Sequence, residues 1–333
     1  MVTSPTAGSQ QADRHGTVVA LTSNMNQTSV RVSPLQLYPG YTDADVQLLE
    51  EFRVPERAPE PGFIVDFLGV KTRVTSLADS QRTFEGVLDI PVPGDYHAEA
   101  IEYVGLLKSV VRARDQFVVL ELGAGWGPWL VAGAKAARQR GIQNVRLYGV
   151  EADPQHFQFM TRHLLDNGLD PARQHLLQAA VGLERGRARW PKIADAANDW
   201  GSRPARIDAS GTNERDASYL GSLLDEYIEV DVVPMSEILE REPRWDLVHV
   251  DVQGWEAQVC EHALAQLNSR VAYLVIGTHS RKLDGDLVDL FHREGWILEH
   301  EKPSRFTYIP GVKLLESMNA ADGTQVWRNP RLC

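Results

Sequence analysis

The chain has 333 residues, of which 43% are hydrophobic and 24% charged, an ordinary globular composition. Its net charge of −11 makes binding by counterion release unfavourable, so we predict no nucleic-acid partner. No apolar run approaches the roughly 20 residues of a membrane span, and the N-terminus lacks the charged-then-apolar order of a signal peptide. Cys260 and Cys333 form neither a disulfide framework nor a zinc motif, so we expect a cytoplasmic protein.

The first 95 residues differ in character from the rest. Residues 1–33 are rich in Ser, Thr, Gln and Asn, which predicts disorder. Residues 34–95 are predicted to form an N-terminal extension, with a helix at Asp43–Phe52 and strands at Phe63–Leu68 and Glu85–Ile90 that pair as a small β element. A helix is then expected from Tyr96 to Arg114, with one apolar face.

Residues 96–333 alternate strands and helices, which predicts a parallel sheet covered on both faces. The expected strands are Phe117–Leu122, Val145–Val150, His175–Val181, Trp245–Val252 and Val271–Gly277, with Trp296–His300 and Thr324–Trp327 as the last pair. The expected helices are Pro128–Arg140, Pro154–Asn167, Trp255–Leu267 and Leu283–Glu294.

The segment 183–229 interrupts this alternation. It mixes Ala, Asp, Arg, Ser and Gly with little periodicity, and it leaves the third strand on the side where ligands bind in such sheets. Long insertions are often functional. We interpret it either as an acceptor-binding loop or as a surface loop without function.

The most informative motif is Glu121-Leu-Gly-Ala-Gly-Trp-Gly-Pro128, a glycine turn between a strand and a helix. Glycines at 123, 125 and 127 permit positive φ and leave room for a ligand. The third glycine comes one residue earlier than in the dinucleotide fingerprint, and Pro128 has no N–H for a phosphate. The motif therefore favours S-adenosylmethionine, which has no phosphate, over a nicotinamide dinucleotide.

Two carboxylates support this donor. Glu121 is suited to its ammonium group, and Glu151, at the tip of the next strand, is suited to the two ribose hydroxyls. Small residues at 179–180 leave room for adenine. The predicted donor-binding residues are Glu121, Gly123, Ala124, Gly125, Trp126, Glu151, Ala152, Asp153, Ala180 and Asp251, with Tyr96 and Glu99 near the mouth of the pocket.

Methyl transfer to a hydroxyl is helped by a base with a pKa near neutral. His279 follows the fifth strand and is the first choice for this base, ahead of His249, which lies deeper in the fourth strand. Asp251, at the carboxyl end of the fourth strand, is expected beside the reacting methyl group. We expect no metal, although Asp251, Glu256 and His279 form an alternative divalent-metal site.

These motifs resemble the FkbM-type class I methyltransferases. The resemblance rests on Glu121–Trp129, Val150–Asp153, Ala179–Gly182 and Val250–Glu256, and it extends from about Tyr96 to Trp327. It implies O-methylation of a sugar, a glycan or a secondary metabolite, and the donor roles given above to Glu121, Gly123 and Glu151. The family commonly has lysine at the position of His249 and glutamate at that of Gln253.

We therefore predict an S-adenosylmethionine-dependent O-methyltransferase that works by in-line transfer with base assistance. The expected fold is α/β and Rossmann-like, a seven-stranded mostly parallel sheet with helices on both faces and a small N-terminal β and helical extension. The partner would be a small-molecule or glycan acceptor, and a homodimer is left open. The alternatives are a nicotinamide-dependent oxidoreductase and a non-catalytic donor-binding subunit.

Overall fold

The structure is a computed structural model that describes residues 40–91, 99–204, 226–312 and 318–333. The predicted disorder of residues 1–33, and the predicted pocket residue Tyr96, lie outside these ranges. None of the described helices is both long and apolar enough to cross a membrane.

A seven-stranded sheet forms the centre of the fold, as predicted. Its strand order is β12-β15-β11-β10-β4-β5-β6, and only the pairings made by β15 are antiparallel. The strands are β4 (Gln116–Leu122), β5 (Asn144–Glu151), β6 (His175–Gln178), β10 (Trp245–Val250), β11 (Val271–Thr278), β12 (Ile297–Lys302) and β15 (Gly323–Arg328). The order reverses between β4 and β10, which is where such sheets bind ligands.

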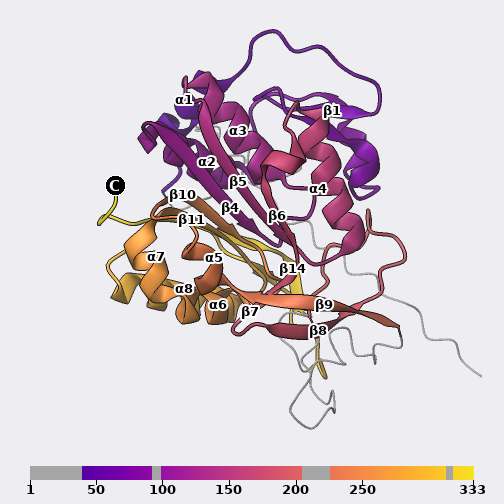
Figure 1. Cartoon of the computed structure of the whole chain (residues 1–333), viewed down its shortest axis with the longest axis vertical. Coiled ribbons are helices and arrows are strands. Elements are labelled where there is room, and N and C mark those ends of the chain that lie inside the picture. The colour runs from indigo at the N-terminus through magenta and orange to yellow at the C-terminus, as the bar shows by residue number, and fades with distance from the viewer. Residues whose placement is uncertain (1–39, 92–98, 205–225, 313–317) are drawn as a thin grey trace, which may run out of the picture. The chain divides into compact units, whose positions relative to one another are not determined.

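Helices cover both faces of this sheet, so its central strands are continuous apolar runs. One face packs against α1 (Asp43–Phe52), α2 (Ala100–Arg112), α3 (Pro128–Gln139) and α4 (Pro154–Asp166). The other packs against α5 (Met235–Leu239), α6 (Glu256–His262), α7 (Leu264–Arg270) and α8 (Arg281–Arg293) (Figure 1). Alternate residues of β4 serve the two layers: Val119 belongs to the first core, and Val118 and Leu120 to the second.

The N-terminal extension contains a small separate sheet. β1 (Phe63–Val65) pairs antiparallel with β2 (Lys71–Arg73) and parallel with β3 (Gly86–Val87). The 3-10 turns η2 (Val74–Ser76) and η3 (Arg82–Phe84) connect these strands. The strand at 71–73 was not predicted, because its polar sequence carries no apolar pattern.

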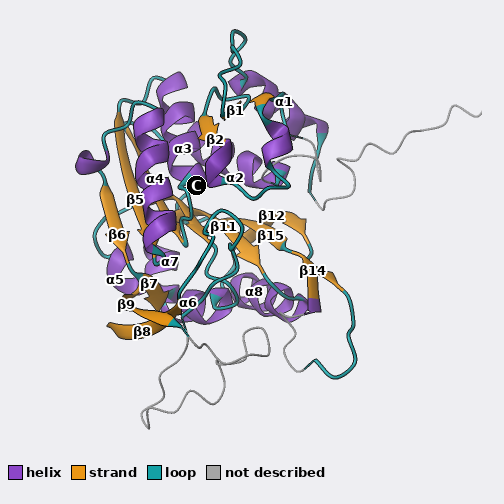
Figure 2. Ribbon diagram, turned by 90° about the vertical axis from the view of Figure 1, so that its right-hand side faces the viewer, coloured by secondary structure: helices purple, strands orange, loops and turns teal. Residues whose placement is uncertain are grey.

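The predicted strand His175–Val181 is wrong in one respect, because it is two strands in two sheets. β6 ends at Gln178, opposite Glu151, where β5 also ends and offers no further partner. The chain then continues as β7 (Ala180–Gly182), which joins β9 (Tyr227–Pro234) and β8 (Gly186–Pro191) in a second sheet. Figure 2 shows this sheet beyond the ends of β5 and β6. The described part of the insertion therefore includes strand β8 and the start of strand β9.

Other boundaries also differ. The predicted helix Trp255–Leu267 breaks at Ala263 into α6 and α7. β10 ends at Val250, two residues early, because the chain turns at Gln253, which has a positive φ of 52°. The short elements η4 (Pro171–Arg173), β13 (Arg305–Phe306) and β14 (Asn319–Ala321) complete the described structure.

Candidate active site

A cavity of about 700 Å³ opens at the carboxyl ends of the parallel strands. It lies beside the residues that follow β4, β5 and β10, where the strand order reverses. Most of the predicted site residues line it: Glu99, Glu121, Gly123, Ala124, Gly125, Trp126, Glu151, Ala152, Ala180, His249 and Asp251.

The glycine turn between β4 and α3 has the conformation that its sequence predicts. Gly123, Gly125 and Gly127 have φ of 72°, 55° and 72°, in the left-handed region. A Cβ on Gly123 would lie 1.7 Å from the carbonyl oxygen of Asp251. The turn and the end of β10 therefore touch, and this contact needs a glycine.

Glu121 is buried beneath the turn, with 1% exposure. Its carboxylate accepts hydrogen bonds from the N–H groups of Trp129 (3.5 Å) and Leu130 (3.0 Å) in the first turn of α3. Burial raises its pKa well above the usual value, and these two hydrogen bonds oppose the rise. Glu121 thus anchors the helix that the glycine turn opens, and it still lines the cavity.

Glu151 ends β5 and supports the same turn. Its carboxylate accepts a hydrogen bond from the N–H of Gly125 (2.8 Å) and another from the N–H of Asp153 (2.8 Å). Burial raises its pKa, and the nearby His156 opposes the rise. Asp153 itself caps α4, accepting from the N–H groups of residues 155 and 156, and it lies behind the cavity wall.

Asp251, His279 and Glu256 form a row of ionisable side chains beside the carboxyl ends of β10 and β11. His279 Nδ1 lies 3.0 Å from Glu256 Oε1, and its Nε2 lies 3.3 Å from Asp251 Oδ1. Burial alone would lower the pKa of His279, but the two carboxylates raise it well above its usual value. Burial would raise the pKa of Asp251, but His279 holds it below the usual value.

Only Asp251 of these three residues lines the cavity. His279 is 7% exposed and stands behind it, with both ring nitrogens facing carboxylates. A histidine that is already protonated has no lone pair for an incoming proton. This arrangement suits His279 to orient Asp251 rather than to act directly on a ligand.

The same three residues are the alternative metal site, because their ligand atoms lie within 4.8 Å of one another. Glu256 is fully buried, and Oε1 accepts from the N–H groups of Val252 and Gly254, both at 3.0 Å, as well as facing His279. These donors already satisfy the carboxylate that a metal would need. The group fits an ion-paired triad, and we derive no metal-dependent step from it.

His249 is differently placed. Its Nε2 lies 3.2 Å from Glu102 Oε1, and its ring lies 5.3 Å from that of Trp129. The carboxylate contact assigns the proton of the neutral ring to Nε2, which leaves the lone pair on Nδ1. Nδ1 is buried and has no hydrogen-bond partner among the described residues, and His249 lines the cavity.

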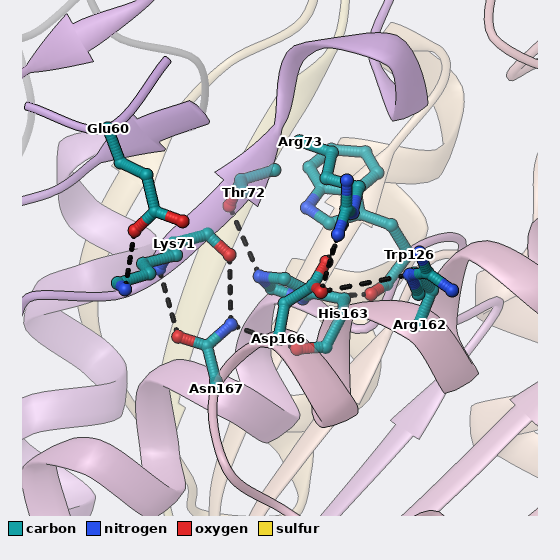
Figure 3. Close-up of polar contacts among 9 residues, drawn as sticks. All are labelled: Glu60, Lys71, Thr72, Arg73, Trp126, Arg162, His163, Asp166 and Asn167. Carbon is teal, nitrogen blue, oxygen red and sulfur yellow. Dashed lines mark hydrogen bonds and ion pairs between the residues drawn. The ribbon is translucent and has the colours of Figure 1, made fainter. Parts of the chain in front are cut away.

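A buried polar cluster joins the N-terminal extension to the glycine turn (Figure 3). His163 of α4 lies 3.0 Å from the carbonyl oxygen of Trp126 through Nδ1, and 3.2 Å from Thr72 Oγ1 of β2 through Nε2. Beside it, Arg73 makes two hydrogen bonds to Asp166. These contacts hold strand β2 against α4 and reach the turn that lines the cavity.

The insertion closes the cavity near Gly125. Trp200 stacks on His156, with ring centroids 4.2 Å apart, and meets Trp126 edge-on at 5.0 Å. A Cβ on Gly125 would lie 3.1 Å from the Trp200 ring. His156 Nε2 is 2.7 Å from the carbonyl oxygen of Ala196, so this part of the insertion is fixed to α4.

The opposite rim comes from the C-terminal hairpin and the start of α2. Lys302 pairs with Glu99, and Asp322 and Thr324 line the same end. Sequence reasoning did not find Glu102, Lys302, Asp322, Trp190 or Trp200, because the turns and insertion that carry them show no motif. For Glu102 the one signal is its place in the first turn of a helix.

Comparisons with known proteins agree with this picture. The methyltransferase FkbM domain model matches residues 129–301. A protein from Jannaschia sp. (strain CCS1), named "Putative methyltransferase", is 30% identical over 286 residues, which cover 85% of this chain and 98% of the relative.

Solved structures with similar coordinates have low sequence identity. The precorrin-6Y C5,15-methyltransferase from Geobacter metallireducens GS-15 is 12% identical with a TM-score of 0.39, over 77% of this chain and 98% of the other. The methyltransferase FkbM from Methylobacillus flagellatus KT is 13% identical with a TM-score of 0.36, over 65% of this chain and 45% of the other.

The strand order, the ligand cavity at its switch point and the sequence matches define a class I methyltransferase that uses S-adenosylmethionine. The family model matches just over half of the chain, and the Jannaschia relative aligns along nearly all of its own length. The chain therefore belongs to the FkbM methyltransferase family.

Proposed function

We propose that the protein methylates a hydroxyl group of a small neutral acceptor, such as a sugar, a glycan or a hydroxylated secondary metabolite. The observation that carries the proposal is the position of Asp251. Its carboxylate lines the cavity, and its backbone carbonyl touches Gly123 of the donor turn. A donor held by that turn and an acceptor held by Asp251 are therefore neighbours, as in-line displacement requires.

The donor end is built to hold a cation. S-adenosylmethionine supplies an electrophilic methyl group on a positively charged sulfur. Glu151 is proposed to bind the ribose hydroxyls, because it already fixes the N–H of Gly125 and lines the wall beside it. Glu121 and the turn residues are proposed to hold the amino-acid part of the donor.

The acceptor end is proposed to divide two tasks between two side chains. Asp251, kept ionised by His279, accepts a hydrogen bond from the acceptor hydroxyl and orients it. His249 Nδ1 then takes the hydroxyl proton as the oxygen attacks the methyl carbon and the carbon–sulfur bond breaks. The imidazolium that results is stabilised by Glu102, 3.2 Å away.

The charge of the cavity wall supports a neutral acceptor. Glu99, Glu102, Asp251 and Asp322 line this end, and Lys302 is the only lysine or arginine among the described residues of the lining. Lys302 is itself paired with Glu99. A phosphate or sulfate on the acceptor would face four carboxylates and one lysine in this part of the lining, whereas hydroxyl groups can donate hydrogen bonds to the carboxylates.

The test is a mass-spectrometric screen with isotopically labelled S-adenosylmethionine. Neutral glycosides and hydroxylated polyketides should gain one methyl group, located on oxygen by NMR, and the 6-phosphates of the same sugars should not. A methyl group found on nitrogen or carbon would contradict the proposal. Binding of adenosylhomocysteine without methylation of any acceptor would favour the non-catalytic alternative.

Once an acceptor is found, Asp251→Asn should lower kcat by about a hundredfold, since the acceptor hydroxyl loses the carboxylate that orients it. Affinity for adenosylhomocysteine should stay within a few-fold of wild type, since the donor contacts remain. Asp231→Asn, on an exposed position of β9, is the matched control and should leave both quantities unchanged. A fully active Asp251→Asn protein would refute the role of this residue.

A further inference from the structure

The insertion contributes a tryptophan to the donor end of the cavity. Trp190, in β8, belongs to a small buried cluster with Ala152, Ala180, Ala188 and Val230. Ala152 directly follows Glu151, and Ala180 begins β7. Trp190, Ala152 and Ala180 all line the cavity. The indole is therefore placed beside the carboxylate that we assign to the ribose.

The indole N–H of Trp190 has no hydrogen-bond partner in the part of the chain that the structure describes. Trp190 is 7% exposed, and its Nε1 is buried without a hydrogen bond to any described residue. A buried donor left unsatisfied costs about 1–3 kcal/mol, so native structures rarely keep one without a reason. The other side chains of the cluster are alanines and a valine, which carry no polar side-chain atom. None of these side chains can accept a hydrogen bond from the indole N–H, and Trp190 itself lines the cavity.

The position of Trp190 is fixed by the sheet that carries it. In the β8–β9 ladder Trp190 pairs with Ile228, and Ala188 pairs with Val230. β9 also pairs with β7, which starts at Ala180. The second sheet therefore holds the indole beside two small residues, Ala152 directly after β5 and Ala180 of β7.

We propose that Trp190 recognises the adenine of the donor, with its Nε1–H donating to a ring nitrogen of the base. This inference rests on the proposed donor site, because it needs the ribose at Glu151. Adenine offers a flat apolar face, which suits the alanines, and unprotonated ring nitrogens, which are acceptors for the indole N–H. The part of the insertion that carries Trp190 then serves the donor and not the acceptor.

The attachment of Trp200 agrees with this role. Trp200 packs on His156 and over Gly125, and His156 Nδ1 is 3.9 Å from Glu151. The side chain of Gln155 also reaches the carbonyl oxygen of Ile193, at 3.3 Å. The packing of Trp200 and the contact of Gln155 both tie the insertion to the end of the cavity that contains Glu151.

The experiment is a calorimetric titration of adenosylhomocysteine into the wild-type protein and Trp190→Phe, which keeps an aromatic ring but lacks the N–H. The variant should bind about 5- to 30-fold more weakly, as expected for one lost hydrogen bond. Trp296→Phe is the matched control, since its Nε1 bonds to Asn268 outside the cavity. It should bind adenosylhomocysteine as the wild type does.

The partner atom is identified with the 1-deaza, 3-deaza and 7-deaza analogues of adenosylhomocysteine. One analogue should bind the wild type more weakly by a similar factor, and Trp190→Phe should bind that analogue as tightly as the wild type does. Equal affinity of the two proteins for adenosylhomocysteine, or an equal loss with all three analogues, would overturn the proposal.

Indole NMR of the ¹⁵N-labelled wild type gives a second readout that does not depend on the folding of a variant. One of the indole N–H signals should move downfield with adenosylhomocysteine and should not move with the analogue that lacks the accepting nitrogen. Identical spectra with all four ligands would reject the hydrogen bond. A wild type that binds no adenosylhomocysteine would refute the proposed function itself, and with it this role of Trp190.

Discussion

His279 and His249 show that the contacts of a histidine ring, more than its position along a strand, decide which chemistry it can perform. His279 stands at the strand end but faces carboxylates on both sides, so its pKa is raised and it has no lone pair to offer. His249 is deeper but has one nitrogen held by Glu102 and the other unpartnered among the described residues. We therefore assign proton transfer to His249 and positioning to His279.

Gly123 offers a test of how tightly the donor turn and Asp251 are coupled. Gly123 and Gly168 have nearly the same φ, 72° and 71°, but only at Gly123 would a Cβ meet another atom, the carbonyl oxygen of Asp251 at 1.7 Å. Gly168→Ala should therefore lower the unfolding free energy only by the cost of a left-handed alanine, about 1–2 kcal/mol. Gly123→Ala should lower the unfolding free energy by clearly more than this. Its affinity for adenosylhomocysteine should also fall, by at least about tenfold, because the turn must move to make room for the Cβ.

Urea unfolding and calorimetry of both variants measure these effects. Equal losses of stability in the two proteins, with donor affinity retained in Gly123→Ala, would show that the close contact is not required.

At the scale of elements, the buried side chain of His163 links the N-terminal sheet to the glycine turn. His163 contacts the carbonyl oxygen of Trp126 on one side and Thr72 of β2 on the other (Figure 3). Burial lowers its pKa from 6.5 to about 4. The neutral ring can then donate from Nδ1 to the carbonyl oxygen of Trp126 and accept at Nε2 from the hydroxyl of Thr72.

This predicts a pH-dependent contribution to stability. Between pH 6.5 and 4 the unfolded chain binds a proton at this histidine and the folded chain does not, so stability falls as the pH falls. Relative to His163→Gln, the wild type should lose roughly 1.4 kcal/mol of unfolding free energy per pH unit within this window. Above pH 6.5 the difference between the two proteins should be constant.

Urea unfolding at several pH values measures the difference, with His262→Gln as a control on an exposed helix end. A wild type and His163→Gln whose stabilities run parallel through the whole range would mean that His163 is protonated in the folded protein.

At the scale of the whole molecule, the cavity is the feature that separates the alternatives. A ligand that binds only the folded state stabilises it by RT ln(1 + [L]/Kd), about 2.7 kcal/mol at a hundredfold excess over Kd. Adenosylhomocysteine should therefore raise the melting temperature by a measurable amount, whereas NAD should not, because Pro128 and the carboxylates of the turn do not suit a diphosphate.

Differential scanning fluorimetry with both ligands, at equal concentration and pH, makes the comparison. Stabilisation by NAD without stabilisation by adenosylhomocysteine would favour the alternative of a nicotinamide-dependent oxidoreductase.

The glycine turn and the strand ends beside it could be predicted from the sequence because local patterns identify them. Glu121, the three glycines and Glu151 sit at strand ends that the alternation of strands and helices already identifies, and local sequence sets the positive φ values of the turn. The seven-stranded sheet followed from the same pattern. Apolar periodicity and glycine spacing are local signals, so they can be recognised in the sequence without knowledge of the fold.

The rest depended on contacts between distant segments. Glu102 meets His249 across 147 positions, and Trp190 reaches Ala152 only because β8 and β9 form a second sheet. No pattern in the neighbouring sequence indicates either contact. The pKa of His279 likewise depends on Glu256 and Asp251, which come together with it when β10 and β11 pair. Local sequence determined the glycine turn and the strand ends at the cavity, and tertiary packing decided which other side chains face the cavity and in which charge state.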